Sequence, residues 1–448
     1  MYEKNRTVLF RKYLFPRKWK IPVSCSRMLP KINVWILFLF GALLSLGVFL
    51  FFGCSESSRQ SVVVATHRKE IAAYIEAFNT DQDQYRMELQ FIPEGPITIP
   101  SEGPVPDLVI SEHIAGRDTI KNFRSLDSLF YKRKISLRSF YTGLLRLGKK
   151  DNKQHLLPAS FDLPLLMYNN RLPGKENEKF LLNLEDIKTI SASYNKVQSG
   201  RFINMGFSPL WYPDFLLVVA LLHGAEFTED GERVLSFKEK NIQNALSFLR
   251  DWSKTNNGGA SAEIEYQEKY LTTPPYRQAS LERVRYAYST ASSFFLLPEN
   301  RRLGLDLRWI GNNDKITTLE NVLFMGIPVK AENSRGAEAF LSWFFQPSTQ
   351  KKLLEASQRK FTHFFGIFSG FSSLKEINET EYPRLYPILV GHIPPEEILV
   401  FPPPVPFMWG ELKKRIILPY FLDQVQDAKQ EEKLQDRLNA WLMARPIH

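Results

Sequence analysis

The stretch Ser61-Val62-Val63-Val64-Ala65 is a short apolar run rich in valine, and such runs typically become buried strands of a parallel sheet. Apolar residues then recur at helical spacing: Ile71, Tyr74, Ile75 and Phe78. Residues 79–84 are polar enough to end that helix, and residues 86–91 alternate between polar and apolar as a second strand. This order of strand, helix and strand predicts a β-α-β unit and therefore an α/β fold.

Polar residues follow the carboxyl ends of two predicted strands. The first strand runs into a Thr-His-Arg sequence, and a third short strand at residues 107–110 runs into Ser-Glu-His. Folds of this type place ligand contacts at the carboxyl ends of their strands. We therefore predict these ligand contacts: Thr66, His67, Arg68, Glu112 and His113. The alternative for His67 is a surface position at the start of the helix.

Upstream of this unit, residues 32–53 form a run of 22 residues without a charge, long enough to cross a bilayer as a helix. The residues before the run carry nine Lys or Arg against one acid, which is the bias of a cytoplasmic flank. The remainder of the chain is therefore predicted to be exported. Because 31 residues are unusually many before an apolar leader run, Met28 is the predicted start.

Cys54 stands where the apolar run gives way to a polar segment. The sequence Leu50-Phe51-Phe52-Gly53-Cys54 resembles a bacterial lipobox, in which the chain is cut before the cysteine and the thiol is acylated. The resemblance implies a lipid anchor on Cys54 that holds the protein to a membrane of the cell envelope, facing the periplasm or the exterior. The alternative is an uncleaved membrane anchor with an incidental cysteine.

Length and charge limit the classes of function. From Cys54 onward the chain has about 395 residues, which suits two lobes better than one core. The leader supplies +8 of the formal net charge of +10, and the remainder near +2 argues against a nucleic-acid partner. Cys25 and Cys54 are the only cysteines, so nothing beyond the leader can form an intramolecular disulfide.

The segment from Leu156 to Leu172 combines Leu-Pro, an apolar run and Tyr-Asn. It resembles the segment in which extracellular solute-binding proteins of the sugar-binding family, which serve ABC importers and include maltose-binding-type proteins, cross from the first lobe to the second. Residues 183–187 resemble that family's next helix start, residues 206–225 its buried helix, and residues 323–350 its return to the first lobe. The order of these segments carries the resemblance, because no single motif is diagnostic.

The resemblance implies a two-lobed clamshell, similar to a periplasmic binding protein, in which each lobe is a mixed sheet flanked by helices and crossing strands join the lobes. It also implies a monomer. The predicted division is an n-region and apolar segment at 1–53, a tether at 54–61, a first lobe at 62–157 and 323–356, and a second lobe at 158–322 and 357–448.

A clamshell receptor needs contacts from both lobes, because its ligand bridges them and shifts an equilibrium between open and closed forms. Aromatic side chains cover sugar rings, and carboxylates, amides and Arg pair with sugar hydroxyls. The second-lobe candidates are Asp162, Trp211, Tyr212, Asp214, Arg308 and Trp309. As alternatives, Trp211 packs against the prolines that flank it, and Asp214 is an acid favoured in the first turn of a helix.

The sequence favours a lipid-anchored extracytoplasmic protein that is not an enzyme and that delivers a sugar or another polar solute to an ABC permease. An exported hydrolase is less favoured, because the chain has neither a Gly-x-Ser-x-Gly elbow nor a His-Glu-x-x-His helix. A lipoprotein that keeps the fold but binds a protein is the third alternative. No cofactor or metal is expected, because Gly143 to Lys150 matches phosphate-loop spacing only up to its last position, where Lys150 replaces Ser or Thr.

Overall fold

The computed structural model describes residues 59–93, 97–100, 102–174, 179–229, 231, 234–359, 364–427 and 432–444. Residues 59–448 form one compact unit. The predicted start at Met28, the apolar leader and the lipidation site at Cys54 lie outside the described residues. Among the described helices, none combines the length and the apolar character that crossing a bilayer requires.

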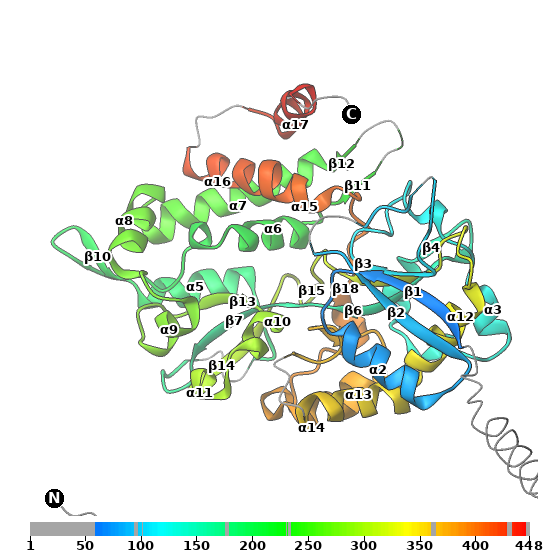
Figure 1. The fold of residues 1–448 in the computed structure, drawn as a ribbon. Coiled ribbons are helices and arrows are strands. Elements are labelled where there is room, and N and C mark those ends of the chain that lie inside the picture. Colours follow the sequence, from blue (N-terminus) through cyan, green and yellow to red (C-terminus); the bar gives the residue numbers. More distant parts are fainter. Residues whose placement is uncertain are drawn as a thin grey trace, which may run out of the picture. The chain divides into compact units, whose positions relative to one another are not determined.

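Two mixed sheets organise the chain (Figure 1). The first has the order β17 (Phe371–Ser372), β6 (Leu156–Phe161), β16 (Leu323–Gly326), β3 (Leu108–Ser111), β1 (Gln60–Thr66) and β2 (Tyr85–Phe91). The second has the order β13 (Ala287–Thr290), β7 (Pro164–Asn169), β14 (Leu305–Gly311) and β8 (Leu181–Asn183). In the first sheet β1 pairs in parallel with β2 and β3, whereas β16 is antiparallel to both β3 and β6.

Helices surround these sheets. Those between β1 and β14 are α2 (Ile71–Asp81), α3 (Asp127–Tyr131), α4 (Thr142–Arg146), α5 (Leu184–Tyr194), α6 (Pro213–Leu222), α7 (Glu239–Asn257), α8 (Ala260–Tyr270), α9 (Pro275–Ser280), α10 (Ala291–Leu296) and α11 (Glu299–Arg302). Later helices are α12 (Ser334–Phe344), α13 (Pro347–Arg359), α14 (Tyr382–Leu385), α15 (Trp409–Leu412), α16 (Leu418–Gln426) and α17 (Leu434–Met443). Small two-stranded pairs are β4 (Lys149–Lys150) with β5 (Lys153–Gln154), β9 (Lys196–Gln198) with β10 (Arg201–Asn204), β11 (Phe227–Thr228) with β12 (Ser236–Phe237), and β15 (Ile316–Thr317) with β18 (Leu399–Val400).

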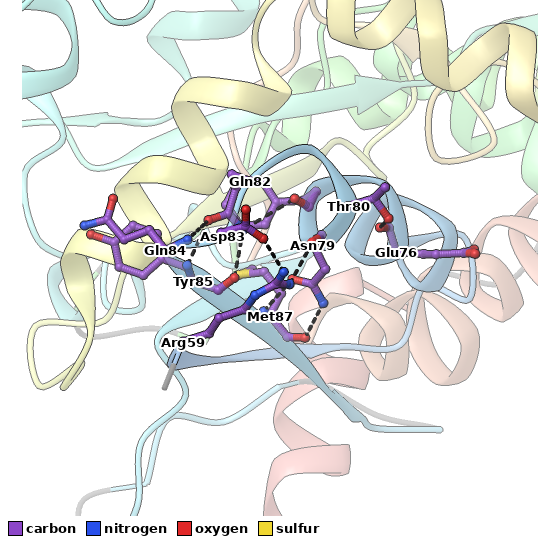
Figure 2. A network of polar contacts seen from close by, with 10 residues as sticks. Arg59, Glu76, Asn79, Thr80, Gln82, Asp83, Gln84, Tyr85 and Met87 are labelled. Atoms are coloured by element: carbon purple, nitrogen blue, oxygen red, sulfur yellow. Dashed lines mark hydrogen bonds and ion pairs between the residues drawn. The ribbon is translucent and has the colours of Figure 1, made fainter. Parts of the chain in front are cut away.

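The β-α-β unit predicted at the start is confirmed as β1, α2 and β2, and the four apolar residues at helical spacing are the buried face of α2. Side-chain amides fix the turn from α2 into β2 (Figure 2). Asn79 accepts a hydrogen bond from the amide of Met87 at 2.8 Å and donates one to its carbonyl at 3.1 Å. Gln82 accepts from the amide of Tyr85 at 2.8 Å. These bonds hold β2 beside the helix and so set the direction of β1.

The chain passes between the sheets at points where strands end. It leaves the first sheet at the end of β6, and β7 of the second sheet begins at Pro164. It returns between β15 and β16, where the amide of Leu319 donates to the carbonyl of Asp162 at 3.0 Å. Crossing segments between two mixed sheets confirm the predicted α/β fold class.

Two apolar clusters stabilise the sheets. One includes the first sheet, α2, α12 and one face of the second sheet, and the other includes the opposite face of the second sheet with α6, α7 and α16. The nearly uninterrupted apolar sequence of α6 explains its position, because all residues from Phe215 to Leu221 are buried. The first turn of α6, which carries Asp214, is thereby held at a fixed place beside the second sheet.

Candidate ligand-binding site

The ends of β1 and β3 bring three predicted residues together. β1 and β3 are neighbours in the sheet, with Thr66 opposite Ile110. Beyond these ends, His67 Nε2 lies 2.8 Å from Glu112 Oε2, and Arg68 pairs with the other oxygen of the same carboxylate. Buried Thr66 accepts a hydrogen bond from the amide of Arg68 at 3.1 Å, which orients the turn.

The side chain of Glu112 has a pKa well below that of an ordinary glutamate. Burial alone would raise its pKa, but the hydrogen bond from His67 and the charge of Arg68 outweigh burial and lower the pKa from 4.5 to about 2. Within the described residues, His67 Nδ1 and Arg68 Nε are buried without a hydrogen-bond partner. These two nitrogens are therefore polar atoms for which a bound ligand could supply partners.

We expect Glu112→Gln to lower the unfolding free energy by about 2 kcal/mol at pH 6, because the substitution removes a carboxylate that the fold stabilises in its charged form. The folded pKa lies below 4.5, so this contribution is complete above about pH 4.5 and is lost as the pH falls towards 2. Urea unfolding at several pH values measures it. The exposed Glu88→Gln is the control, and a difference between the variants that does not shrink on acidification would contradict the assignment.

Asp162 lies at the crossing from the first sheet to the second and is buried. One oxygen accepts hydrogen bonds from the amides of Leu163 at 2.8 Å and Ser292 at 3.1 Å, and the other accepts from the Ser292 hydroxyl at 2.5 Å. Burial raises the pKa of Asp162, and these hydrogen bonds only partly offset that rise. Asp162 thus ties the crossing segment to the start of α10.

A buried ion pair stands near this crossing. Lys413, which follows α15, lies 2.7 Å from Asp214 at the start of α6 and also pairs with Glu320, between β15 and β16. The side chain of Glu320 is only 6% exposed, whereas that of Asp214 is 53% exposed. Burial would lower the pKa of Lys413 and raise that of Glu320, but their mutual attraction outweighs burial and moves both pKa values the other way.

These groups line a cavity of about 730 Å3, which we call the solute cavity. Its polar lining comes from six segments: Asp162, Asp214, Ser289, Thr290, Ser292, Ser293, Arg301, Glu320, Asn321 and Lys413. Tyr276 and Tyr288 add aromatic surface, and Pro274, Pro275 and Leu297 add apolar surface. A volume of this size, with hydroxyls, charges and aromatic rings in its walls, suits a small polar ligand.

His113 connects the first sheet to this region. It lies with Glu320 on the walls of a small cavity of about 20 Å3, and Glu320 also lines the solute cavity. Its backbone has φ of +60°, which is uncommon for a residue other than glycine and marks a sharp turn after β3. Burial lowers the pKa of His113, although the nearby carboxylates of Glu112 and Glu320 oppose that effect.

The predicted aromatic contacts at the start of α6 lie in the packed interior. Trp211 is 6% exposed, stacks on Tyr266 and donates from Nε1 to the carbonyl of Glu263 at 3.0 Å. Tyr212 stacks on Phe207 with ring centroids 5.6 Å apart. Neither ring is part of the solute-cavity lining, and as ligand contacts these two residues stay a prediction.

Arg308 and Trp309 are buried within β14. Arg308 pairs with Asp306 at 3.0 Å, and Trp309 donates from Nε1 to the carbonyl of His392 at 2.7 Å. The first pair lies within β14 and the second bond holds β14 against the segment around His392, and neither side chain lines the solute cavity. As ligand contacts, these two residues stay a prediction.

Sequence reasoning missed several lining residues, above all Lys413, Glu320, Tyr276, Tyr288 and the Ser and Thr residues between positions 289 and 293. Lys413 and Glu320 are far apart in the chain and only tertiary packing brings them together, so no local spacing marks them. The Ser-Thr composition of residues 289–293 is a weak signal that a search for hydroxyl clusters could have found. Among the described residues, no group of three or more His, Cys, Asp or Glu is placed to hold a metal ion.

Comparison with known proteins gives a consistent result for the fold. The sugar-binding protein MalE from Xanthomonas citri aligns with a TM-score of 0.63 at 11% identity, over 85% of this chain and 95% of that one. A sugar transporter from Rhizobium etli in an open conformation aligns with a TM-score of 0.60 at 10% identity, over 86% of this chain and all of that one. This chain has the sugar-binding-protein fold.

A third structure with this fold, an ABC substrate-binding protein from Listeria monocytogenes in complex with cycloalternan, aligns with a TM-score of 0.58 at 12% identity over 86% of this chain and 97% of that one. No protein-family model and no curated protein matches the sequence. The predicted two-lobed architecture is therefore confirmed from the fold, while the low identities carry no residue correspondence. The solute cavity is lined by Asp162 and Glu320, which stand on the two segments where the chain crosses between the sheets.

Proposed function

We propose that this protein is an extracytoplasmic receptor that binds a carbohydrate or another polar solute and delivers it to an ABC permease. The observation that carries the proposal is the solute cavity, which places carboxylates, hydroxyls and two tyrosines beside the crossing segments of a sugar-binding-protein fold. Tyr276 and Tyr288 would cover apolar ring faces, and Asp214 with the hydroxyls of residues 289–293 would pair with ligand hydroxyls.

We place His67, Arg68, Glu112 and His113 on the opposing lobe, from which they would contact the ligand when the lobes close. The buried nitrogens of His67 and Arg68 that lack partners support this assignment. Closure around a ligand shifts an equilibrium only by the difference in affinity between the open and closed forms, so contacts from both lobes are required.

We propose a binding role rather than an enzymatic one, because solved structures with this fold are named as sugar-binding and substrate-binding proteins. We further propose that acylation of Cys54 anchors the receptor to a membrane, as a monomer, with the lobe boundaries that the sequence predicts, except that β6 and β17 belong with the first sheet in which they pair. Mass analysis of the detergent-extracted chain would detect the added acyl groups, and an unmodified, uncleaved leader would instead support the membrane-anchor alternative.

A panel of neutral monosaccharides and oligosaccharides tests the proposed function. A true ligand raises the melting temperature by an amount that grows with its concentration, and mass spectrometry can identify a solute retained through purification. Failure of every solute in a broad panel would favour the protein-binding alternative, and turnover of a glycoside would favour a hydrolase.

For a ligand found in this way, we expect Asp214→Asn to weaken binding about tenfold, because the substitution removes a half-exposed carboxylate that can accept hydrogen bonds from hydroxyls. Isothermal titration calorimetry measures the change. Asp436→Asn is the matched control, because Asp436 is also an acid in the first turn of a helix but lies outside the solute cavity. Equal affinities for the two variants would remove Asp214 from the site.

A further inference from the structure

A second cavity, of about 940 Å3, shares no lining residue with the solute cavity. Its walls come from four parts of the chain: the loop after β3, the stretch of α4 and β4, the strand β11 with the residue on either side of it, and the segment around β18. The volume lies at the upper end of the range for small-molecule sites. This cavity is therefore large enough for a complete small molecule rather than a single ion.

Positively charged side chains line this second cavity, and no described carboxylate forms an ion pair with them. Within the described part of the chain, no hydrogen bond or ion pair engages the guanidinium of Arg117 or Arg146 or the ammonium of Lys149. Lys150 donates from Nζ to the backbone carbonyl of Arg117 at 3.3 Å, a contact that leaves its charge unneutralised. Four cations thus line one cavity, and none of the described carboxylates is paired to them.

The carboxylates of the same walls are mostly engaged elsewhere. Glu226 pairs with Lys238 at 2.6 Å, and Glu396 pairs with Lys375 at 3.0 Å. Because both lysines lie outside the lining, these pairs leave little negative charge for the cavity.

Glu229 is engaged by backbone groups, since it accepts hydrogen bonds from the amides of Asp118 at 2.9 Å and Phe407 at 3.0 Å. Asp151, at the turn between β4 and β5, is the other acid of the lining. Backbone bonds leave the charge of Glu229 in place, so Glu229 and Asp151 stand against the four cations, and the net charge of these side chains is still positive.

An apolar wall faces the cations. It consists of Leu399, Phe401, Pro403 and Pro404, with Leu147 and Ile120 beside them. The ring of Phe401 is fixed, because it lies 6.0 Å from the ring of Phe161 and 6.2 Å from that of Tyr141. A ligand with a charged end and a carbon framework would fill such a cavity better than a free inorganic anion.

We propose that the second cavity binds a phosphate ester, with Arg117, Arg146 and Lys149 on the phosphate and the wall formed by Phe401 and its neighbouring prolines on the organic part. Arginine presents a planar set of donors that matches a phosphate group, and lysine adds a compact positive charge. The stretch from Gly143 to Lys150 folds as α4 followed by β4, so its side chains recognise the phosphate and its backbone does not form a phosphate loop.

Calorimetric titration of the full chain in a neutral detergent at 0.15 M salt tests this site. The probes are glucose 6-phosphate as a soluble monoester, dihexanoyl phosphatidylglycerol as a lipid diester, and glucose as the neutral match for the first. We expect saturable binding of a phosphate ester and an affinity about tenfold lower in Arg146→Gln and in Lys149→Gln, since each removes a charged hydrogen-bond donor. Arg138→Gln and Lys132→Gln are matched controls, because both residues are exposed and lie outside the cavity.

Binding of the sugar phosphate would identify the ligand as a soluble phosphate ester, and binding of the lipid alone would identify it as a lipid headgroup. Either result supports the site if Arg146→Gln weakens the binding. Absence of saturable binding for both probes, or binding equal in Arg146→Gln and Arg138→Gln, overturns the proposal. Asp214→Asn separates this site from the solute cavity, because it should leave the affinity for the phosphate probe unchanged. Loss of phosphate binding in Asp214→Asn would place the phosphate in the solute cavity and also overturn the proposal.

Discussion

Replacing Lys413 by alanine is expected to lower the unfolding free energy by about 3 kcal/mol at pH 7. Lys413 is the cation that neutralises Glu320, whose side chain is only 6% exposed. Removal of one partner of a buried ion pair leaves the other charge in a poorly solvated place, which costs more than the pair itself contributes. The same substitution empties part of the solute-cavity wall, so the affinity for the solute should fall as well.

Urea unfolding of Lys413→Ala measures this effect, with Lys414→Ala as the control. Lys414 is exposed in the same helical turn, so its removal should change the free energy by less than about 0.5 kcal/mol. Adding Glu320→Gln to Lys413→Ala should recover part of the loss, because it removes the unpaired charge. Equal stabilities for Lys413→Ala and Lys414→Ala would show that Glu320 is well solvated.

The pH dependence gives an independent check of the same ion pair. The pKa of Glu320 is lowered by Lys413 despite burial. Its contribution to stability is therefore complete above the unfolded value of 4.5 and is lost as the pH falls through the lower folded value. The difference in unfolding free energy between the wild type and Lys413→Ala should accordingly shrink as the pH falls, starting above pH 4.5, because the buried Glu320 that has lost its partner takes up a proton at higher pH in the variant.

Local patterns were sufficient for the first β-α-β unit and for the candidate residues at the ends of β1 and β3, whose contact with a ligand stays a prediction. The valine run and the helical spacing after it predicted β1 and α2, because strand and helix periodicities are properties of neighbouring residues. The rule that parallel strands present their carboxyl ends at one edge predicted ligand contacts at His67, Arg68 and Glu112, and the structure brings these three side chains together. Both predictions depend only on short segments and on a general property of sheets.

The solute-cavity wall could not be predicted in the same way. Lys413 reaches Asp214 and Glu320 only after α15 has packed near α6, so the contact depends on the tertiary fold. Trp211 shows the opposite case, a predicted ligand contact that the fold covers. Its neighbours in the sequence suit an exposed ring that could stack on a sugar, but Tyr266 of α8 covers the ring. For an aromatic residue between prolines, the sequence therefore does not tell which face of the ring another helix will cover.

Glu263 gives the second large expected effect, because Glu263→Ala should lower the unfolding free energy by about 3 kcal/mol. This carboxylate is fully buried and accepts hydrogen bonds from the Ser253 hydroxyl at 2.7 Å and the Asn257 side chain at 2.5 Å. Alanine would leave the Ser253 hydroxyl and one N–H of the Asn257 amide buried without this acceptor, while the amide keeps its bond to the carbonyl of Phe207 at 3.1 Å. The carbonyl of Glu263 holds Trp211, so the start of α6 with Asp214 should also become less well placed.

The control for Glu263→Ala is Glu268→Ala, an exposed acid on the same helix that should change stability by less than about 0.5 kcal/mol. Glu263→Gln tests the ionisation separately. Burial raises the pKa of Glu263, so the folded state holds its proton to higher pH than the unfolded state does, and stability falls as the pH rises from 4.5 through the folded value. Glutamine cannot ionise, so the stability of Glu263→Gln relative to the wild type should increase between pH 5 and pH 8. A constant difference over that range would mean that Glu263 is charged in the fold and that its hydrogen bonds compensate fully for burial.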